Sequence, residues 1–437
     1  LLILKSCQPT TNSRTLYLIL RTLYLKKNTQ TLLVIALVWP EPASTAAGVR
    51  MMQLLEVFKK QGYSITIASA ASRSEYAADV ELLGYNSQDI KMNDASFDVF
   101  VKDLHPDVVL FDRFLTEEQF GWRVAENCPD ALRILDTEDL HSLRHVREQC
   151  FKKDVPFTTD AWLIDDKTKR EIASIYRCDL SLIISSYELE LLTDVIKIDE
   201  SLFLLLPFMV DEITDDTKWN SFDERTDFIF IGGGKHAPNI DAVKCLKTTI
   251  WPLVHKQLPE AKLHVYGAYL PQQILEMHNP ATGFLVHGRA EAVDDVMSAA
   301  KVCLAPLRFG AGIKGKLISA MQNGTPSITT TLGAEGMAGI LDWNGYIEND
   351  HTAFVAAAVR LYTVKDTWQQ SQNQGKTLIN TLYAKTSLES VFLEKVTQLQ
   401  KYLTDHRTQN FTGALLQHQT MTATKFLSKW IEEKNKV

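Results

Sequence analysis

Residues 305–321 read APLRFGAGIKGKLISAM, a turn that follows an apolar run and opens a predicted helix over 312–323. Three glycines within six positions let the backbone approach a ligand closely and let free N–H groups converge on it. The N-terminus of a helix attracts an anion through its unpaired N–H groups and its dipole. Arg308, Lys314 and Lys316 add positive charge at the same place. We therefore predict a diphosphate-binding turn in which Gly312 and Ile313 contact the ligand; a tight turn with solvated lysines is the alternative.

Strands and helices alternate through the first half of the chain. Residues 32–38 form a continuous apolar run, which is typical of a parallel strand covered on both faces. A helix is predicted next, because apolar residues at 51, 54, 55 and 58 share one helical face. Further strands are predicted at 64–69, 107–111, 132–136, 180–184 and 203–207, with helical segments at 117–127 and 142–177. This alternation predicts a parallel sheet wrapped by helices.

The same rhythm restarts after an acidic stretch at 209–226. Strands are predicted at 228–231, 263–266, 284–286, 302–305 and 326–330, and a helix at 238–255 that Pro252 should kink or end. The fold class predicted is therefore α/β, with two doubly wound parallel sheets in series. The predicted units are an extension at 1–30, a first domain at 31–207, a linker at 208–225, a second domain at 226–366 and a helical segment at 367–437.

Composition narrows the class of protein. The 437 residues are 45% hydrophobic and 23% charged, with a formal net charge of −7, which argues against a general nucleic-acid binder. Six cysteines show no CxxC pair and no zinc-ligand spacing, which favours reduced thiols in the cytoplasm and no bound metal. No apolar run is long enough to span a membrane. Residues 1–30 are basic without acidic residues; they predict an extension outside the fold, or alternatively a peripheral membrane anchor.

Several segments together resemble one enzyme family. Residues 308–321, followed by Gly324-x-Pro326 and by TTLGAEGM at 330–337, look like the nucleotide-sugar half of a family 4-like GT-B glycosyltransferase (glycosyl transferases group 1). Gly232 with PNIDA at 238–242 resembles the start of that half. The loop from Pro40 to Arg50 and the segment DTEDLHSLR at 136–144 resemble parts of the acceptor half. The resemblance implies two Rossmann-like domains facing across a cleft.

The family also implies a reaction. A nucleoside diphosphate sugar is the donor, and the sugar is usually transferred with retention of configuration and without a bound metal or other cofactor. Carried onto this chain, the resemblance places Gly232, Gly233 and Glu335 at the donor, although Glu335 could equally cap a turn. Gly48 would let the acceptor-side loop approach the leaving group, and Arg50 would reach the phosphate or an anionic acceptor.

Two departures from the family pattern concern the donor contacts. Many relatives carry two glutamates eight positions apart, the second touching the donor ribose; here those positions are Ala311 and Ser319. Many also carry Arg and Lys after the first strand of the donor half, where this chain has Gly233 and no clear counterpart of the Lys. The phosphate contacts are then expected from Lys314, Lys316 and Arg308, which would stabilise the charge of the leaving diphosphate.

Acceptor-side candidates follow the strand at 132–136. Asp139, His141 and Arg144 lie where catalytic groups collect in such folds. His141 could orient a hydroxyl or relay a proton, or it could be a hydrogen-bonded residue at a helix start. Asp139 could instead cap the next helix. His236, beside Gly234, could lie near the cleft or be a plain loop residue, and the second interpretation is preferred.

Three functions can be compared with these sequence features. The first is a glycosyltransferase acting on a glycan or lipid-linked acceptor, possible at a membrane face. The second is an inactive protein of the same fold that binds a sugar nucleotide or glycan, which Ser319 favours. A nicotinamide-dependent dehydrogenase is disfavoured, because Gly232-Gly233-Gly234 lacks GxGxxG spacing. The sugar, the base and the acceptor cannot be read from the sequence.

Overall fold

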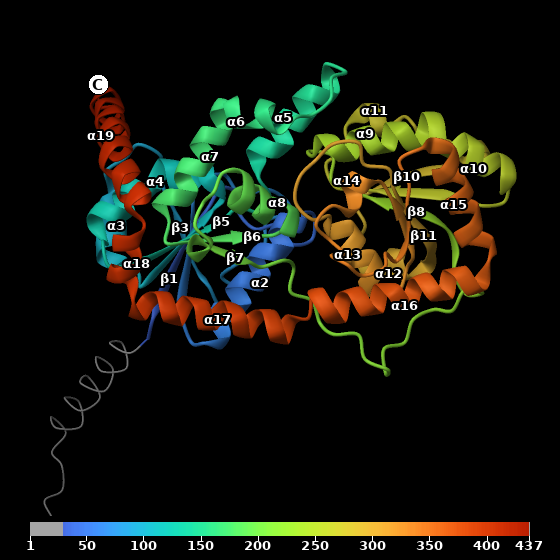
Figure 1. The fold of residues 1–437 in the computed structure, drawn as a ribbon, viewed down its shortest axis with the longest axis horizontal. Helices are drawn as coiled ribbons and strands as arrows, with labels where there is room; N and C mark the ends of the chain where they lie inside the picture. Colours follow the sequence, from blue (N-terminus) through green and yellow to red (C-terminus); the bar gives the residue numbers. More distant parts are fainter. Residues whose placement is uncertain (1–28, 437) are drawn as a thin grey trace, which may run out of the picture.

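The computed structural model describes residues 29–436, apart from the side chains of residues 419–421. Cys7 and all but the last two residues of the predicted extension therefore lie outside the described residues. Two parallel sheets stand side by side, each wrapped by helices (Figure 1). The predicted fold class is confirmed. Among the helices described, none is long and apolar enough to cross a membrane.

The first sheet has the strand order β3-β2-β1-β4-β5-β6-β7, and all its pairings are parallel. Its central strands are apolar on both faces, as expected for strands covered by helices. The edge strand β3 was missed because its sequence, NSQD, has no apolar residue. The strands are β1 (Thr31–Ala36), β2 (Ser64–Ser69), β3 (Asn86–Asp89), β4 (Val108–Asp112), β5 (Leu132–Asp136), β6 (Leu180–Ile183) and β7 (Phe203–Leu205).

Helices cover both faces of this sheet and bury one apolar cluster on each. The helical stretch predicted at 142–177 is three helices, because Asp154 adopts a left-handed conformation and Thr158 and Asp165 each cap a new helix. The helices are α2 (Ala46–Lys60), α3 (Ser96–Leu104), α4 (Arg113–Asn127), α5 (His141–Lys152), α6 (Thr159–Ile164), α7 (Asp166–Arg177) and α8 (Ser186–Glu190).

The second sheet has the order β10-β9-β8-β11-β12-β13, again with parallel pairings. The short strand β13 at its edge was missed, since three residues carry no periodic signal. The strands are β8 (Thr226–Ile231), β9 (Leu263–Tyr266), β10 (Phe284–Gly288), β11 (Ala300–Ala305), β12 (Ser327–Thr329) and β13 (Gly345–Ile347).

The helices of the second domain differ from the prediction in two places. The segment 238–255 is interrupted by a π-helical turn, Leu246–Ile250, and Pro252 lies in the first turn of the next helix, where it is tolerated. The helix after the glycine-rich turn begins at Gly315 rather than at 312, because Gly312 has φ +63°. These helices are α9 (Ala237–Cys245), α10 (Trp251–Gln257), α11 (Gln272–Leu275), α12 (Val293–Ala299), α13 (Gly315–Gln322), α14 (Thr331–Ala334) and α15 (His351–Thr363).

The C-terminal helices connect the two domains. Helix α16 (Lys365–Leu382) packs against α13, whereas α17 (Lys385–Lys401) returns to the first domain and adds Phe392, Val396 and Leu399 to its core. Helices α18 (Leu403–Gln409) and α19 (Phe411–Lys434) follow, and α19 lies along α4 and α7 at the outer end of that domain (Figure 1). The tail therefore braces both domains.

Candidate functional site

The loops at the carboxyl ends of the two sheets meet, and we call this contact surface the seam. Ala46, the first residue of α2, lies against Gly315, the first residue of α13; a Cβ added to Gly315 would be 2.8 Å from that of Ala46. Tyr269 of the second domain donates a hydrogen bond of 3.0 Å to Glu41 of the first. The N-termini of α2 and α13 thus lie next to each other, and such ends attract anions.

The glycine-rich turn reaches the seam through backbone that residues with a Cβ rarely adopt, and at Gly312 there is no space for a Cβ. Gly312 has φ +63°, and a Cβ there would lie 2.7 Å from the side chain of Asp139 in the other domain. The side chain of Ile313 is buried in an apolar cluster with Ile184, Phe208 and Leu317. The turn is therefore anchored by its apolar residue and pressed against the first domain by its glycine.

Lys314 is half-buried in this turn, and within residues 29–436 no carboxylate lies within ion-pair distance of its Nζ, although Glu335, Glu188 and Asp139 are near enough to favour its charged form. Its Nζ donates to the carbonyl oxygens of Ala311, at 3.3 Å, and of Gly312. Burial lowers the pKa of Lys314 to about 8. With this pKa the ammonium is charged in most molecules at pH 7 and in about half of them at pH 8, and a bound anion would favour the charged form.

Lys316 lies two residues further along the chain, in the first turn of α13. Its Nζ is 2.5 Å from Oδ1 of Asn239 on α9 and 4.4 Å from the centre of the Phe230 ring. Burial lowers the pKa of Lys316 to about 7. Asn239 is held in turn by the carbonyl of Gly233, to which its amide donates at 3.0 Å. The N-terminal turns of α9 and α13 are therefore linked through Lys316.

Glu188 of α8 crosses the seam to the glycine-rich turn. Its Oε1 accepts from the backbone N–H of Gly312 at 2.8 Å and from that of Leu140 at 3.0 Å, while its buried Oε2 has no hydrogen-bond partner among the described residues. Burial and the nearby Asp139 raise the pKa of Glu188 to about 8. A carboxyl group from the first domain thus lies beside Ala311, where relatives carry a glutamate of their own.

Glu335 forms a second connection across the seam. Arg147 of α5 donates to both carboxylate oxygens of Glu335, at 2.7 and 2.8 Å, and also to the carbonyl of Gly310 at 2.9 Å. The Arg147 side chain is almost fully buried. In this structure Glu335 is the residue that ends α14, and its carboxylate is engaged in an interdomain ion pair; a contact with the donor stays a prediction.

Arg308 does not point at the other two cations. Its guanidinium makes a bidentate pair with Asp241 on α9, at 2.8 and 2.6 Å, and lies over the Phe151 ring at 4.7 Å. With 40% of its side chain exposed, it lies at the rim of the seam. The expectation that Arg308 shares one phosphate-facing surface with Lys314 and Lys316 is not met, because Asp241 already neutralises it.

Arg50 also differs from its expected position. It is fully buried, with Nε 2.8 Å from Asp136 at the end of β5 and Nη1 2.7 Å from the carbonyl of Leu206. It cannot reach a ligand at the seam from there, and it instead neutralises a buried carboxylate. Gly48 lies in the first turn of α2, where a Cβ would be 2.3 Å from the backbone of Glu41, so the glycine lets the preceding loop fold back onto the helix.

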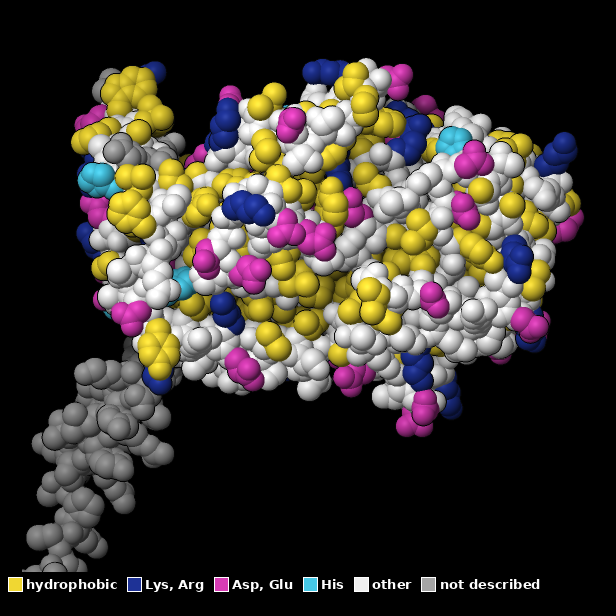
Figure 2. Space-filling model, viewed as in Figure 1, with side chains coloured by type: hydrophobic (Ala, Val, Ile, Leu, Met, Phe, Trp, Pro, Cys, Tyr) yellow, Lys and Arg dark blue, Asp and Glu magenta, His cyan; other side chains and the backbone are white. Residues whose placement is uncertain are grey.

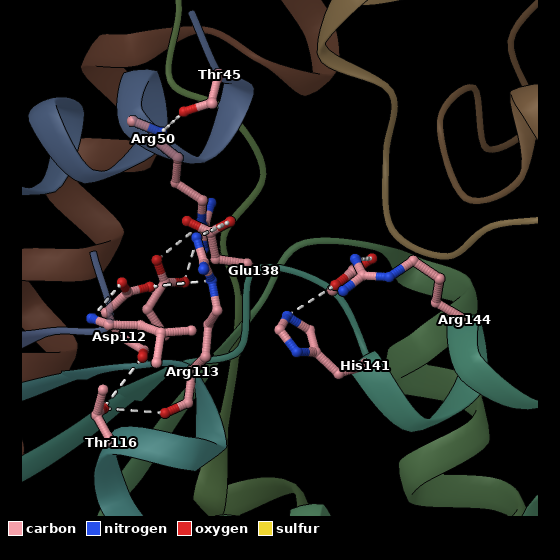
Figure 3. Close-up of polar contacts among 12 residues, drawn as sticks. Thr45, Arg50, Asp112, Arg113, Thr116, Glu138, His141 and Arg144 are labelled. Atoms are coloured by element: carbon pink, nitrogen blue, oxygen red, sulfur yellow. Dashed lines mark hydrogen bonds and ion pairs between the residues drawn. The ribbon is translucent and has the colours of Figure 1, made fainter. Parts of the chain in front are cut away.

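Asp139, His141 and Arg144 lie together on the first-domain side of the seam (Figure 3). Asp139 pairs with Arg144, and its carboxylate is 3.4 Å from Nε2 of His141. Burial alone would raise the pKa of Asp139, but Arg144 and other nearby positive charges outweigh it and hold that pKa at about 2. Burial lowers the pKa of His141 to about 3, so the imidazole is neutral at pH 7.

A buried charged cluster lies beneath these residues. Arg113 is 3.3 Å from Asp112 and 3.4 Å from Glu138, and both Arg113 and Glu138 have positive φ, at +70° and +61° (Figure 3). Burial raises the pKa of Glu138 to about 8. Strained backbone of this kind persists only where surrounding structure imposes it, and it is frequent at functional sites.

Most of the other residues predicted for the site are packed against neighbouring parts of the protein. A Cβ on Gly232 would meet the Asn239 side chain at 2.6 Å, whereas Gly233 faces Ser44 across the seam with open space. The Ser319 hydroxyl is buried without a hydrogen-bond partner among residues 29–436. His236 is the residue before α9 and lies close enough to Arg144 and Asp139 of the seam for their charges to act on it; burial lowers its pKa to about 4. Within the described residues, no cluster of three or more His, Cys, Asp or Glu is placed to hold a metal ion.

Sequence reasoning missed Glu188, Arg147 and Asn239. Glu188 follows the carboxyl end of β6, where ligand-facing groups collect, and that position alone could have selected it. Arg147 is three residues after Arg144 and therefore on the same helical face. Asn239 lies within the PNIDA segment but was not assigned a role.

Comparisons with known proteins agree with this geometry. Residues 225–364 match the family described as glycosyl transferases group 1. No curated protein sequence matches the chain. Solved structures share the fold across both domains: sucrose-phosphate synthase from Thermosynechococcus elongatus has 15% identity and a TM-score of 0.61 over 85% of this chain and 99% of that one. The pneumococcal O-GlcNAc transferase GtfA, in complex with UDP and GlcNAc, has 13% identity and a TM-score of 0.62 over 85% and 99%. Anabaena HepE, in complex with UDP, has 9% identity and a TM-score of 0.60 over 85% and 100%.

The resemblance noted in the sequence is therefore confirmed. The second domain carries a glycosyltransferase family domain, and the two domains together have the GT-B fold.

Proposed function

We propose that this chain, a glycosyltransferase of the GT-B fold, transfers a sugar from a nucleoside diphosphate sugar bound at the seam to a glycan or lipid-linked acceptor. One observation carries the proposal: Lys314 and Lys316 are half-buried beside the adjoining N-termini of α2 and α13, and within residues 29–436 neither forms an ion pair with a carboxylate. Two linked phosphates are the ligand that would neutralise both. The pneumococcal and Anabaena structures hold UDP, so uridine nucleotides are the first probes.

The chemistry follows from where negative charge develops. When the bond from the sugar C1 to the phosphate oxygen breaks, the electron pair goes to the leaving diphosphate, and Lys314 and Lys316 stabilise it. The acceptor oxygen forms the new bond to C1 on the face from which the phosphate leaves, and its proton passes to the departing phosphate oxygen; attack on that same face gives retention. The proposal assigns the charge stabilisation to lysines rather than to a bound metal. Removal of one such donor costs about a hundredfold in rate.

His141 is assigned to the acceptor in a limited role. A group with a pKa of about 3 is too weak a base to remove a hydroxyl proton at pH 7. The neutral imidazole can still accept a hydrogen bond from the acceptor and orient it, with Asp139 fixing the ring. His141→Ala is then expected to raise KM for the acceptor more than it lowers kcat.

The test is turnover on a panel of uridine, guanosine and adenosine diphosphate sugars, read as released nucleoside diphosphate. Release that disappears in Lys314→Met and Lys316→Met supports the transferase. Ala311 and Ser319, which replace the family's glutamates, favour a second candidate, a sugar-nucleotide binder without activity. Binding of a nucleoside diphosphate by thermal shift, with no release from any donor and acceptor pair, would establish that candidate instead.

The state of the cysteines supports our proposal for the cellular location. The cysteines of the described residues, which are Cys128, Cys150, Cys178, Cys245 and Cys303, are all free thiols. Free thiols are usual in a reducing compartment. We keep the cytoplasm as the proposed site of a step in glycan biosynthesis.

A further inference from the structure

The outermost helix of the chain, α19, has two very different faces. Its inner face is held on the first domain by polar contacts along its whole length. Gln417 donates to the carbonyl of Arg177 at 2.8 Å, Lys425 pairs with Glu126 at 2.7 Å, and Ser428 donates to Asn93 at 2.9 Å. Glu432 pairs with the buried Arg123. The helix is therefore fixed in orientation, and its other face is turned outward by the fold.

That other face, which we call the outer face of α19, is apolar and aromatic. Phe426 is 65% exposed, Leu427 58% and Trp430 60%, and Phe411 and Leu415 extend the face toward the start of the helix. Figure 2 shows hydrophobic side chains gathered on this projecting helix. Single exposed apolar residues need no explanation, but two aromatic rings and a leucine within five positions on a fixed helix form a patch that monomeric proteins rarely leave uncovered.

Positive charge accompanies the aromatic residues. Lys429 forms no ion pair within the described residues, and the Nζ of Lys434 lies 5.3 Å from the centre of the Trp430 ring rather than against a carboxylate. The exposed acid nearby, Glu433, already pairs with Lys436. The last two turns therefore present tryptophan, phenylalanine and leucine together with lysines that have no counter-charge.

We infer that the outer face of α19 lies on an anionic lipid bilayer and attaches the first domain to it. Tryptophan and phenylalanine partition to the headgroup region, lysine side chains reach the lipid phosphates, and an amphipathic helix of this composition binds in the plane of the interface. Charge decides between lipid and a second copy of this chain, since two copies joined through this face would bring the same excess of lysine against itself. The inference does not depend on the proposed transferase activity.

The experiment is flotation of the purified full-length chain with two kinds of vesicle, phosphatidylcholine alone and phosphatidylcholine mixed with phosphatidylglycerol. We expect binding to the anionic vesicles that weakens with added salt. Phe426→Ser/Trp430→Ser should bind at least about tenfold less, because both rings leave the interface. Lys429→Gln/Lys434→Gln should bind anionic vesicles about 20-fold less, at roughly fivefold per lysine.

Ile340→Ser is the matched control, since Ile340 is a fully exposed apolar residue of the other domain, and it should bind like the unaltered chain. Failure of the unaltered chain to bind anionic vesicles would overturn the inference. Undiminished binding by Phe426→Ser/Trp430→Ser would overturn it too, and would assign the membrane contact to the basic residues at 1–28. A concentration-dependent dimer that dissociates in that variant would assign the face to a second copy.

Discussion

Replacement of Lys316 by methionine should make the ligand-free protein more stable and the enzyme inactive. Methionine keeps about the length of the side chain, but removes the charge and with it the electrostatic attraction to the Phe230 ring. The pKa of Lys316 falls from 10.5 to about 7 because its ammonium is poorly hydrated in the folded chain. Such a difference corresponds to about 5 kcal/mol of unfavourable free energy for holding the charge.

Part of this gain is lost with the contacts of the ammonium. The hydrogen bond to Asn239 contributes about 1 to 2 kcal/mol and the contact with Phe230 about 1 kcal/mol. A net stabilisation of about 2 to 3 kcal/mol remains, which corresponds to a rise in Tm of about 4–12 °C for a domain of this size. The same substitution removes a charge that stabilises the leaving group, so kcat should fall about a hundredfold or more.

Differential scanning fluorimetry and nucleoside diphosphate release measure the two effects on one preparation. Lys247→Met is the matched control, because Lys247 also lies over a ring, that of Phe284, and burial also lowers its pKa, but it is remote from the seam. Lys247→Met should leave turnover unchanged. A lower Tm together with full activity in Lys316→Met would refute the reasoning, since it would show that Lys316 is a structural residue.

Three further predictions concern charge at the seam. Since the pKa of Lys316 is about 7 and that of Lys314 about 8 in the free protein, the two lysines should take up protons when a diphosphate binds, and its Kd should rise by up to about tenfold per pH unit between pH 7 and pH 8 and by up to about a hundredfold per unit above pH 8; calorimetry in buffers of different ionisation enthalpy measures this, and a flat profile contradicts it. Burial raises the pKa of Glu188 from 4.5 to about 8, so its contribution to stability is full below pH 4.5 and is lost as pH rises toward 8; Glu188→Gln should therefore raise Tm at pH 8 and leave it unchanged at pH 4.5, whereas an equal shift at both values would rule out the titration. Arg147→Ala leaves Glu335 without its partner and should cost about 3 kcal/mol in the free energy of unfolding, with Arg147→Met/Glu335→Met recovering part of the loss in the same denaturant titration; a double variant no better than the single one would contradict an interaction between the two.

The fold class could be predicted because its signals are local. Buried parallel strands are continuous apolar runs, such as residues 32–38, and each is followed by a helix with a regular apolar face. The edge strands β3 and β13 could not be predicted, because pairing at a sheet edge needs only backbone groups. Their sequences, NSQD and GYI, show little or no apolar pattern. The packing of the C-terminal helices could not be predicted either, because α17 and α19 contact elements that lie hundreds of positions earlier in the chain.

The site could be predicted only where one segment supplies it. The glycine-rich turn is continuous in sequence, so Lys314 and Lys316 were identified together with the backbone that holds them. The contacts from Arg147 to Gly310 and from Glu188 to Gly312 join residues more than a hundred positions apart, and no local pattern encodes such pairs. Arg50 was misplaced for the same reason, since its partner Asp136 is 86 positions away.

The three cations of the turn differ in what each contacts, although they are close together in the sequence. Arg308 is paired with Asp241 in the absence of any ligand, and its charge is already neutralised. Within the part of the chain that the structure describes, Lys314 and Lys316 donate hydrogen bonds to neutral oxygens and form no ion pair, and burial lowers the pKa of both. A charge that the protein leaves unneutralised at a cost in stability is the one that an anionic ligand can neutralise with a gain in binding free energy. The two lysines, and not the arginine, are therefore the residues at which a diphosphate is expected to bind.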